Sequence, residues 1–176
     1  MPRSLLILLP VIFLSALACG QGQDESKRGP STPEERKRFL TLVQKLEKAP
    51  LDDSLKPEVT WAEQWLNDIP DINVSVCSAP LGNLVGERYK YAGHLSVQFA
   101  FGMAVFLIQH PNKAADRNAQ YVAGVQEALR TYRSILKSQS RAQSAAMDEL
   151  VAKDAEGTLD DFVRDAAKDC GDTDRS

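Results

Sequence analysis

The sequence has no concentration of positive charge and no apolar run long enough to cross a bilayer. Its 21 Lys and Arg residues are interspersed with 24 Asp and Glu residues, and the formal net charge is −3. Nucleic-acid binding needs a concentrated basic face, so this distribution argues against nucleic acid as a partner. The most apolar stretches, residues 5–14 and 95–108, fall short of the roughly twenty residues that a membrane-spanning helix needs.

Residue types that carry catalysis are also scarce. The two histidines, His94 and His110, lie at opposite ends of one expected helix, about 24 Å apart by the helical rise, so they cannot share a metal ion. The sequence contains no nucleophile elbow, phosphate-binding loop or dinucleotide fingerprint. We therefore expect no enzyme, no metal and no cofactor. The alternative is a thiol-dependent hydrolase or other enzyme that uses Cys77 as nucleophile and His94 as base.

The first eighteen residues have the order of a secretion signal. Arg3 gives a positive start, residues 5–14 form an apolar core broken by Pro10, and residues 15–18 form a small-residue exit. The apolar core is too short for a comfortable membrane span, so we expect residues 1–18 to be a signal peptide that is removed after export.

Cys19 stands directly after this cleavage position. The preceding Ser-Ala-Leu-Ala resembles a lipobox, although Ala16 stands where leucine is usual. We expect Cys19 to carry a lipid, which would be the only attachment to the membrane and would make the protein a periplasmic or outer-surface lipoprotein. The alternative is a chain released as a secreted protein.

The chain has only three cysteines, and their odd number bears on this choice. An exported chain meets an oxidising environment in which thiols tend to pair, so one of the three is left over. If Cys19 is lipidated, Cys77 and Cys170 can form a single disulfide. The alternative is that Cys77 and Cys170 are two separate buried thiols.

The mature chain is expected to hold one domain. Residues 19–31 are nearly devoid of apolar side chains and are expected to form a flexible tether, residues 32–171 a single helical domain, and residues 172–176 a disordered tail. Cap residues and apolar periodicity predict the helices. They are expected from Pro33 to about Ala49, from Pro57 to about Ile69, over 95–108, from about Ala114 to Lys137, through Met147 to a stop at Gly157, and from a capping box at Thr158 toward Cys170.

One stretch does not fit a helix. Ile72, Val74 and Val76 alternate with polar residues, which is a strand-like period of two. A single strand cannot form a sheet, so we expect residues 71–77 to be an extended connector, with a short edge pairing as the alternative. The sequence therefore predicts an irregular all-α bundle of five to six helices with one extended connector.

Residues 95–108 are apolar on every side, which indicates a helix surrounded by others. Gln98 near its start would be a poor lipid-facing residue, so we expect a central core helix instead of a membrane span. Gly102, flanked by Ala100 and Ala104, would let a neighbouring helix approach closely.

Two groups of aromatic residues could form recognition surfaces. Arg88, Tyr89, Lys90 and Tyr91 combine tyrosines with long cations, which suits contacts with a ligand or partner. The alternative is a helix end whose amphipathic rings cover the core. The pair Trp61 and Trp65 shares one helix face and suits either a stacking platform or the core.

Four stretches carry a resemblance to a known family. They are Trp61-Ala62-x-x-Trp65-Leu66, Ile69-Pro70-Asp71-Ile72-x-Val74-x-Val76-Cys77, Lys90-Tyr91 and Ala123-Gly124-Val125-Gln126-Glu127-Ala128-Leu129-x-x-Tyr132. Over roughly residues 35–170 the chain resembles a family of small exported bacterial proteins with no assigned function. The resemblance implies export and helical character, and it transfers no catalytic residue.

Together these patterns predict an exported envelope protein that is not an enzyme. Its helical domain is expected to bind an envelope protein or a small apolar ligand, with a purely structural lipoprotein as the alternative. The sequence makes no prediction about the oligomeric state.

Overall fold

The computed structural model of the chain describes residues 28–170, and within these residues it contains six α-helices and no strand. The predicted signal peptide, Cys19, the first part of the tether and residues 171–176 lie outside the described residues. The helices are α1 (Pro33–Lys48), α2 (Lys56–Asp68), α3 (Ala92–Gln109), α4 (Arg117–Ser138), α5 (Ala145–Glu156) and α6 (Leu159–Ala166). This confirms the prediction of an irregular all-α bundle of five to six helices.

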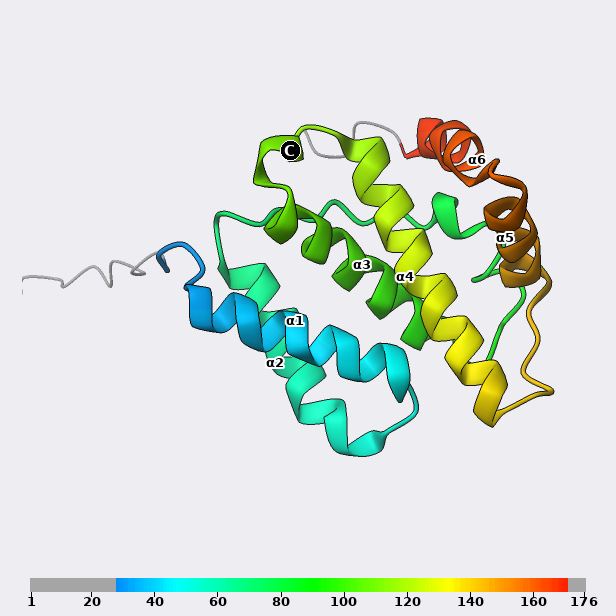
Figure 1. Cartoon of the computed structure of the whole chain (residues 1–176), viewed down its shortest axis with the longest axis horizontal. Coiled ribbons are helices and arrows are strands. Elements are labelled where there is room, and N and C mark those ends of the chain that lie inside the picture. Colours follow the sequence, from blue (N-terminus) through cyan, green and yellow to red (C-terminus); the bar gives the residue numbers. More distant parts are fainter. Residues whose placement is uncertain (1–27, 171–176) are drawn as a thin grey trace, which may run out of the picture.

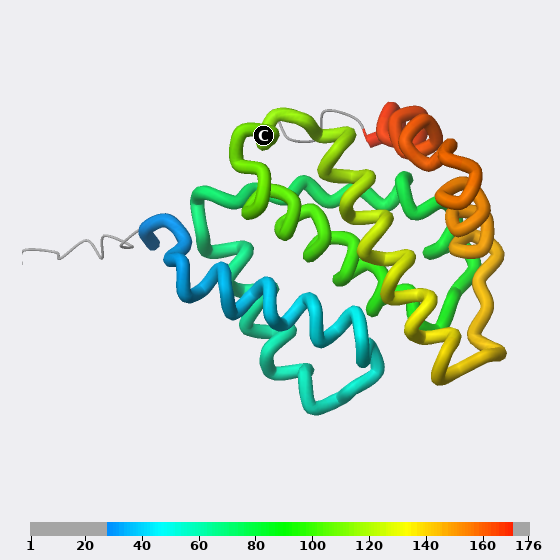
Figure 2. The backbone as a smooth tube through the Cα atoms, in the orientation of Figure 1, coloured from blue at the N-terminus to red at the C-terminus, as the bar shows by residue number. Residues whose placement is uncertain are grey.

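The bundle is built around α3 and α4, which pack against each other along much of their length. Helices α1 and α2 lie on one side of this pair, and α5 and α6 lie on the other side (Figure 1). The backbone trace shows the long connection from α2 to α3 passing behind the central pair to the α5 side (Figure 2). The central pair therefore separates two halves of the core.

Glycines allow the close approach of α3 and α4. A Cβ atom at Gly102 of α3 would lie 2.5 Å from Glu127 Cβ, and one at Gly124 of α4 would lie 2.7 Å from the Phe99 carbonyl oxygen. Both distances are shorter than a methyl group allows. The predicted role of Gly102 is confirmed, whereas the role of Gly124 was not predicted.

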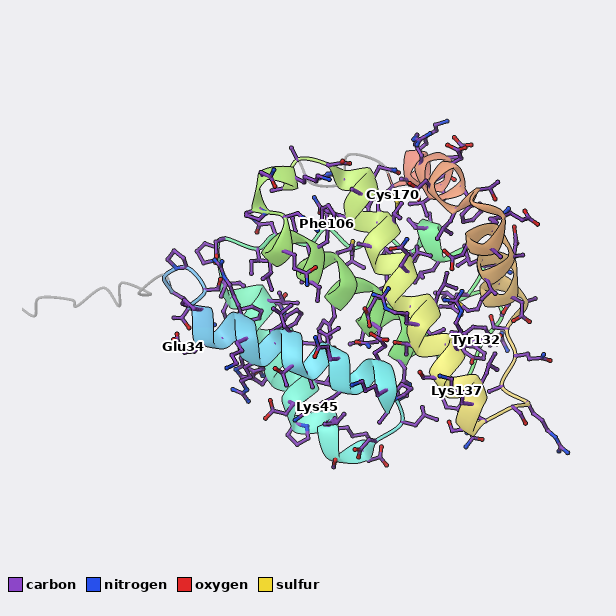
Figure 3. All side chains as sticks on the ribbon, in the orientation of Figure 1. Glu34, Lys45, Phe106, Tyr132, Lys137 and Cys170 are labelled. Atoms are coloured by element: carbon purple, nitrogen blue, oxygen red, sulfur yellow. A yellow bond between two sulfur atoms is a disulfide. The ribbon has the colours of Figure 1, made fainter. Side chains whose placement is uncertain are left out.

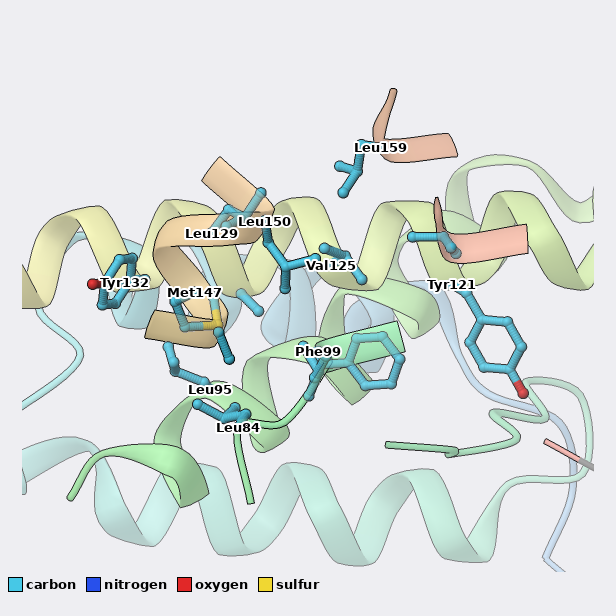
Figure 4. Packing of buried hydrophobic residues seen from close by; sticks show 14 of the residues in the cluster. Leu84, Leu95, Phe99, Tyr121, Val125, Leu129, Tyr132, Met147, Leu150 and Leu159 are labelled. Carbon is cyan, nitrogen blue, oxygen red and sulfur yellow. The ribbon is translucent and has the colours of Figure 1, made fainter. Parts of the chain in front are cut away.

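Helix α3 contributes opposite faces to two apolar clusters. Leu95, Phe99 and Met103 join the α4 cluster, which includes side chains of α4, α5 and α6 (Figure 4). Phe101 and Leu107 join the α1 cluster, which includes side chains of α1 and α2. This explains why the sequence of α3 is apolar on every side. By length and composition α3 is the one helix of residues 28–170 that could cross a membrane, and 44% of its residues are buried within the bundle.

Local cap residues define most of the helix ends. At the start of α1 the Thr32 hydroxyl accepts from the Glu35 amide at 3.2 Å and the Glu35 carboxylate accepts from the Thr32 amide at 2.9 Å, which is the predicted capping box. Gly157 ends α5 with a φ of 73°, as expected for a left-handed cap. The capping box predicted at Thr158 is wrong, because the Thr158 hydroxyl donates back to the Lys153 carbonyl oxygen at 3.4 Å.

Over residues 72–77 the connector between α2 and α3 forms neither helix nor strand, so the predicted connector is present and the alternative of a short edge pairing is not. Its first part, Ile72, is buried in the α1 cluster. A disulfide joins its last residue, Cys77, to Cys170, which follows α6 in the sequence, and the two Cα atoms are 5.8 Å apart. The predicted pairing of these two cysteines therefore matches the structure, and the alternative of two separate thiols does not.

Asp71 attaches the segment before α1 to the connector. Its carboxylate accepts hydrogen bonds from the Ser31 amide at 2.8 Å, the Ser31 hydroxyl at 2.7 Å and the Arg36 guanidinium at 2.8 Å. Ser31 is itself buried. Residues 28–31 were assigned to the tether, yet Ser31 is part of the packed domain and Arg28 forms an ion pair with Glu35.

The Asp71 cluster should make the stability of the fold depend on pH. Burial raises the pKa of Asp71, but the hydrogen bonds from Ser31 and Arg36 outweigh it, and the net shift is downward. A carboxyl with a lowered folded-state pKa stabilises the fold above its ordinary pKa, and this stabilisation is lost as the pH falls toward the lowered value. We expect Asp71→Asn to cost about 1 to 2 kcal/mol at pH 7 and less at pH 3.

Urea unfolding of both proteins at the two pH values measures this difference. Asp68→Asn, which removes the same charge from an exposed position at the end of α2, is the matched control and should change stability little. If Asp71→Asn lowers the free energy of unfolding by the same amount at pH 3 as at pH 7, the ionised Asp71 carboxylate is not the source of the stabilisation.

Candidate functional site

An apolar cleft of about 430 Å³ opens between the end of α1, the start of α2 and the first turns of α3. Its volume lies within the range of small-molecule sites in proteins. The residues that line it are Leu46, Pro50, Leu51, Asp52, Asp53, Leu55, Lys56, Val59, Thr60, Gly93, His94, Val97 and Gln98.

The turn between α1 and α2 forms one side of this cleft. Pro50 follows the end of α1, and a short 3₁₀ turn over Asp53–Leu55 leads into α2. On the α3 side the lining begins with Gly93, where an added Cβ atom would meet no atom within 4 Å. The missing side chain at this position leaves space between α3 and the turn.

The walls of the cleft are aliphatic. Leu55, Val59 and Val97 line it and are only partly buried, while packing against the α1 cluster. Leu46 closes the wall from α1 and is almost fully buried. A ligand that covers Leu55, Val59 and Val97 would remove their remaining apolar surface from water, at about 25 cal/mol per Å².

Gln98 is a buried polar residue among those that line the cleft. Its side chain is 2% exposed, and its amide Nε2 donates to Thr131 Oγ1 at 3.1 Å and more weakly to Glu127 Oε1 at 3.4 Å. Its carbonyl Oε1 is buried and has no hydrogen-bond partner among the residues that the structure describes. Buried polar atoms are usually paired, so this atom requires an explanation.

Behind Gln98 lies a buried carboxyl, Glu127, which is 3% exposed. Burial raises the pKa of Glu127. The paired guanidinium of Arg130 lowers this pKa, but the effect of burial is larger and the net shift is upward. Arg130 also reaches Glu47 at the end of α1 at 3.4 Å. The polar network therefore connects the Gln98 side of the cleft to α4 and α1.

The charged groups of the cleft lie on its α2 side. Lys56 pairs with Asp53 at 2.9 Å. Asp52 accepts from the side chain and the backbone amide of Ser54, and these hydrogen bonds lower the pKa of Asp52, which is ionised at neutral pH. The lining thus holds two carboxylates and one ammonium group.

The structure does not present Arg88 to Tyr91 as an open recognition surface. Tyr91 is 7% exposed, and the Tyr89 hydroxyl donates to the Ala142 carbonyl oxygen at 2.8 Å. Burial, with the neighbouring Tyr91 and Asp148, raises the pKa of Tyr89 to about 12. Only Arg88 and Lys90 are exposed, and Lys90 lies over the ring of Tyr91 at 5.0 Å. Tyr91 thus belongs to the α4 cluster, and Tyr89 packs against it.

Tyr89 belongs to a polar group that fixes the chain between α4 and α5. Its ring packs edge-on against Tyr132, which lies on α4 facing α5 (Figure 3). The Tyr132 hydroxyl donates to Asp148 at 2.6 Å and accepts from the Ser144 amide at 3.0 Å. The carboxylate of Glu87 accepts from the Ser144 hydroxyl and the Ala146 amide, both at 2.7 Å. Each of these polar groups therefore has a hydrogen-bond partner within the fold.

The two tryptophans are not an open stacking platform either. Trp65 is 1% exposed and packs against Phe39, with a ring distance of 5.1 Å. Trp61 stacks on Trp65, and the guanidinium of Arg38 covers its ring at 3.7 Å. Both rings therefore serve packing between α1 and α2.

The proposed nucleophile and base are not assembled as a catalytic pair. The Cys77 sulfur is bonded to Cys170 and is no free thiolate. His94 is exposed, lines the cleft and packs edge-on against Tyr91, at a ring distance of 5.9 Å. Within residues 28–170 no three side chains of His, Cys, Asp or Glu are grouped so that they could hold a metal ion.

The cleft itself was not predicted from the sequence. Gln98 was noted only as a polar residue in an apolar helix, and that is the one signal that could have indicated it. Comparisons with models of protein families, with curated proteins and with solved structures give no match for this chain.

Proposed function

We propose that the protein is exported, attached to the cell envelope through a lipid on Cys19, and binds a small, largely apolar ligand in the cleft between α1, α2 and α3. The observation that carries this proposal is the cleft of about 430 Å³ with aliphatic walls and a polar group among its lining residues. Apolar walls with a few polar groups are typical of small-molecule sites. A protein partner is the less favoured ligand, because the tyrosine and tryptophan rings that could have offered a flat surface are engaged in packing.

Two features support the envelope location. The disulfide between Cys77 and Cys170 belongs to an oxidising compartment, because cytosolic thiols are kept reduced. With these two cysteines paired, Cys19 is the one cysteine left over in the sequence. A lipid thioether on Cys19 would leave no free thiol in the exported chain.

The binding proposal is tested with a variant that fills the cleft. Gly93→Phe adds a ring where the structure has free space, and we expect it to weaken the binding of a fluorescent alkyl probe at least about tenfold, which is about 1.4 kcal/mol. Gln109→Phe adds the same ring at an exposed position at the other end of α3 and should leave binding unchanged. Equal binding by the two variants would overturn the cleft as the binding site.

The envelope proposal is tested by the intact mass of the protein isolated from its host. We expect the loss of residues 1–18, the added mass of lipid on the new N-terminal cysteine, and a deficit of two hydrogens for the disulfide. Cys19→Ser should move the protein from the membrane fraction to the soluble fraction, whereas Cys77→Ser should not. A wild-type protein that retains residues 1–18 and is found in the cytosol would refute export.

A further inference from the structure

We propose that the natural ligand of the cleft is a neutral amphiphile that donates a hydrogen bond from a hydroxyl or amide group to Gln98 Oε1. Its apolar part would lie along Leu55, Val59 and Val97. This inference rests on the proposed function and specifies the ligand chemistry of the same site.

The first support is the unpaired carbonyl of Gln98. Gln98 Oε1 and Asn118 Oδ1 are buried side-chain oxygens that have no hydrogen-bond partner among the described residues. Of these two residues only Gln98 lines the cleft. A buried acceptor without a donor costs about 1 to 3 kcal/mol, so a ligand that supplies the donor recovers a cost already present in the empty protein.

The second support is the way in which α4 holds the other end of the amide. Gln98 Nε2 donates toward Thr131 and Glu127, both on α4, so the carbonyl oxygen is the end of this cleft-lining side chain that remains for a ligand. The terminal torsion of glutamine has broad minima, and the Thr131 hydroxyl can rotate. Because Oε1 is buried, binding in this way requires the carboxamide to rotate toward the cleft and the Thr131 hydroxyl to follow Nε2.

The third support is the charge of the lining. Asp52 and Asp53 provide two carboxylates against the single ammonium group of Lys56, which already pairs with Asp53. An anionic head group would face an uncompensated carboxylate at the mouth. It would also offer no donor to Gln98. Charge and hydrogen bonding therefore favour the same ligand class and disfavour fatty-acid anions.

The test compares two isomeric probes, 1-octanol and 1-methoxyheptane, with the purified protein and its disulfide intact. They have the same composition, but only the alcohol donates a hydrogen bond. We expect 1-octanol to displace a fluorescent alkyl probe about fivefold more tightly than the ether from wild type, as one buried hydrogen bond allows. Octanoate should bind more weakly than 1-octanol.

Two variants test whether Gln98 causes the preference for 1-octanol over the ether. Gln98→Met keeps the length of the side chain without the carbonyl and should bind both probes equally. Thr131→Val removes a partner of Nε2 and leaves Oε1 in place, so the preference for the alcohol should persist. The comparison in wild type stands even if one of these variants does not fold.

The outcomes separate this inference from the proposed function. If both probes bind wild type equally, or if Gln98→Met keeps the preference, the inference is overturned while the apolar cleft remains as the binding site. If neither probe binds, or if Gly93→Phe binds both as wild type does, the proposed function and this inference fail together.

Discussion

Replacing Gly124 with alanine is expected to lower the free energy of unfolding by about 2 to 3 kcal/mol, near the upper end for overpacked cores. The new methyl group would lie 2.7 Å from the Phe99 carbonyl oxygen, 2.8 Å from the Phe99 ring and 2.9 Å from Met103 Cγ. The Phe99 oxygen is part of the α3 backbone and cannot rotate away. Helices α3 and α4 would have to separate, and both apolar clusters would lose packing, because α3 contributes to both.

The same substitution elsewhere provides the control. Alanine is favoured over glycine in helices by about 1 kcal/mol, and this gain is included in the expected net loss at Gly124. Gly93→Ala, in the first turn of α3, meets no atom within 4 Å and should be neutral or slightly stabilising. Gly102→Ala should behave like Gly124→Ala, since its methyl group would meet Glu127 Cβ at 2.5 Å. Thermal and urea unfolding measure all three, and equal stability of Gly93→Ala and Gly124→Ala would refute the close packing.

Local signals explain why the helices were predicted correctly. Thr32 with Glu35, and Gly157, act through neighbours in the sequence, so a short window contains the whole interaction. The start of α4 was expected near Ala114 but lies at Arg117, because the Asp116 side chain caps it by accepting from the Ala119 amide at 3.0 Å. Gly124 was missed for the opposite reason. Its requirement for a small residue comes from Phe99, which is distant in the sequence.

The candidate site was unpredictable for a related physical reason. Gln98 is recognisable as a polar residue on an apolar helix, but its unpaired carbonyl is defined by Thr131 and Glu127, about thirty residues later. The walls come from α1, the turn at residues 50–55, α2 and α3, so no single sequence window contains them. The tyrosines at positions 89 and 91 show the converse. Their composition suited recognition, and only the tertiary contact of Tyr89 with Ala142 shows that they pack inward.

Removal of the disulfide is expected to have the largest effect on stability. Cys77 and Cys170 are 93 residues apart in the sequence. In the chain-entropy model, closing a loop of this length stabilises the fold by about 4 to 5 kcal/mol. Removing a native disulfide from small secreted domains typically lowers the free energy of unfolding by about 2 to 5 kcal/mol. We expect the double variant Cys77→Ser, Cys170→Ser to lose about 3 to 5 kcal/mol in urea unfolding. Reduction of the wild-type protein should produce the same loss, and it is the control for effects of serine itself.

Removal of the disulfide should not change the affinity of the cleft for a ligand. In the chain-entropy model the bond acts mainly by restricting the unfolded chain, so the folded state should change little when it is removed. Neither cysteine lines the cleft, and Cys77 packs against the α4 cluster, whereas the aliphatic walls pack against the α1 cluster. The folded double variant should therefore bind the alkyl probe with unchanged affinity at a temperature well below its lowered melting point. A parallel loss of affinity and stability would mean that the bond positions α3 against α2, and that the cleft forms only in the oxidised protein.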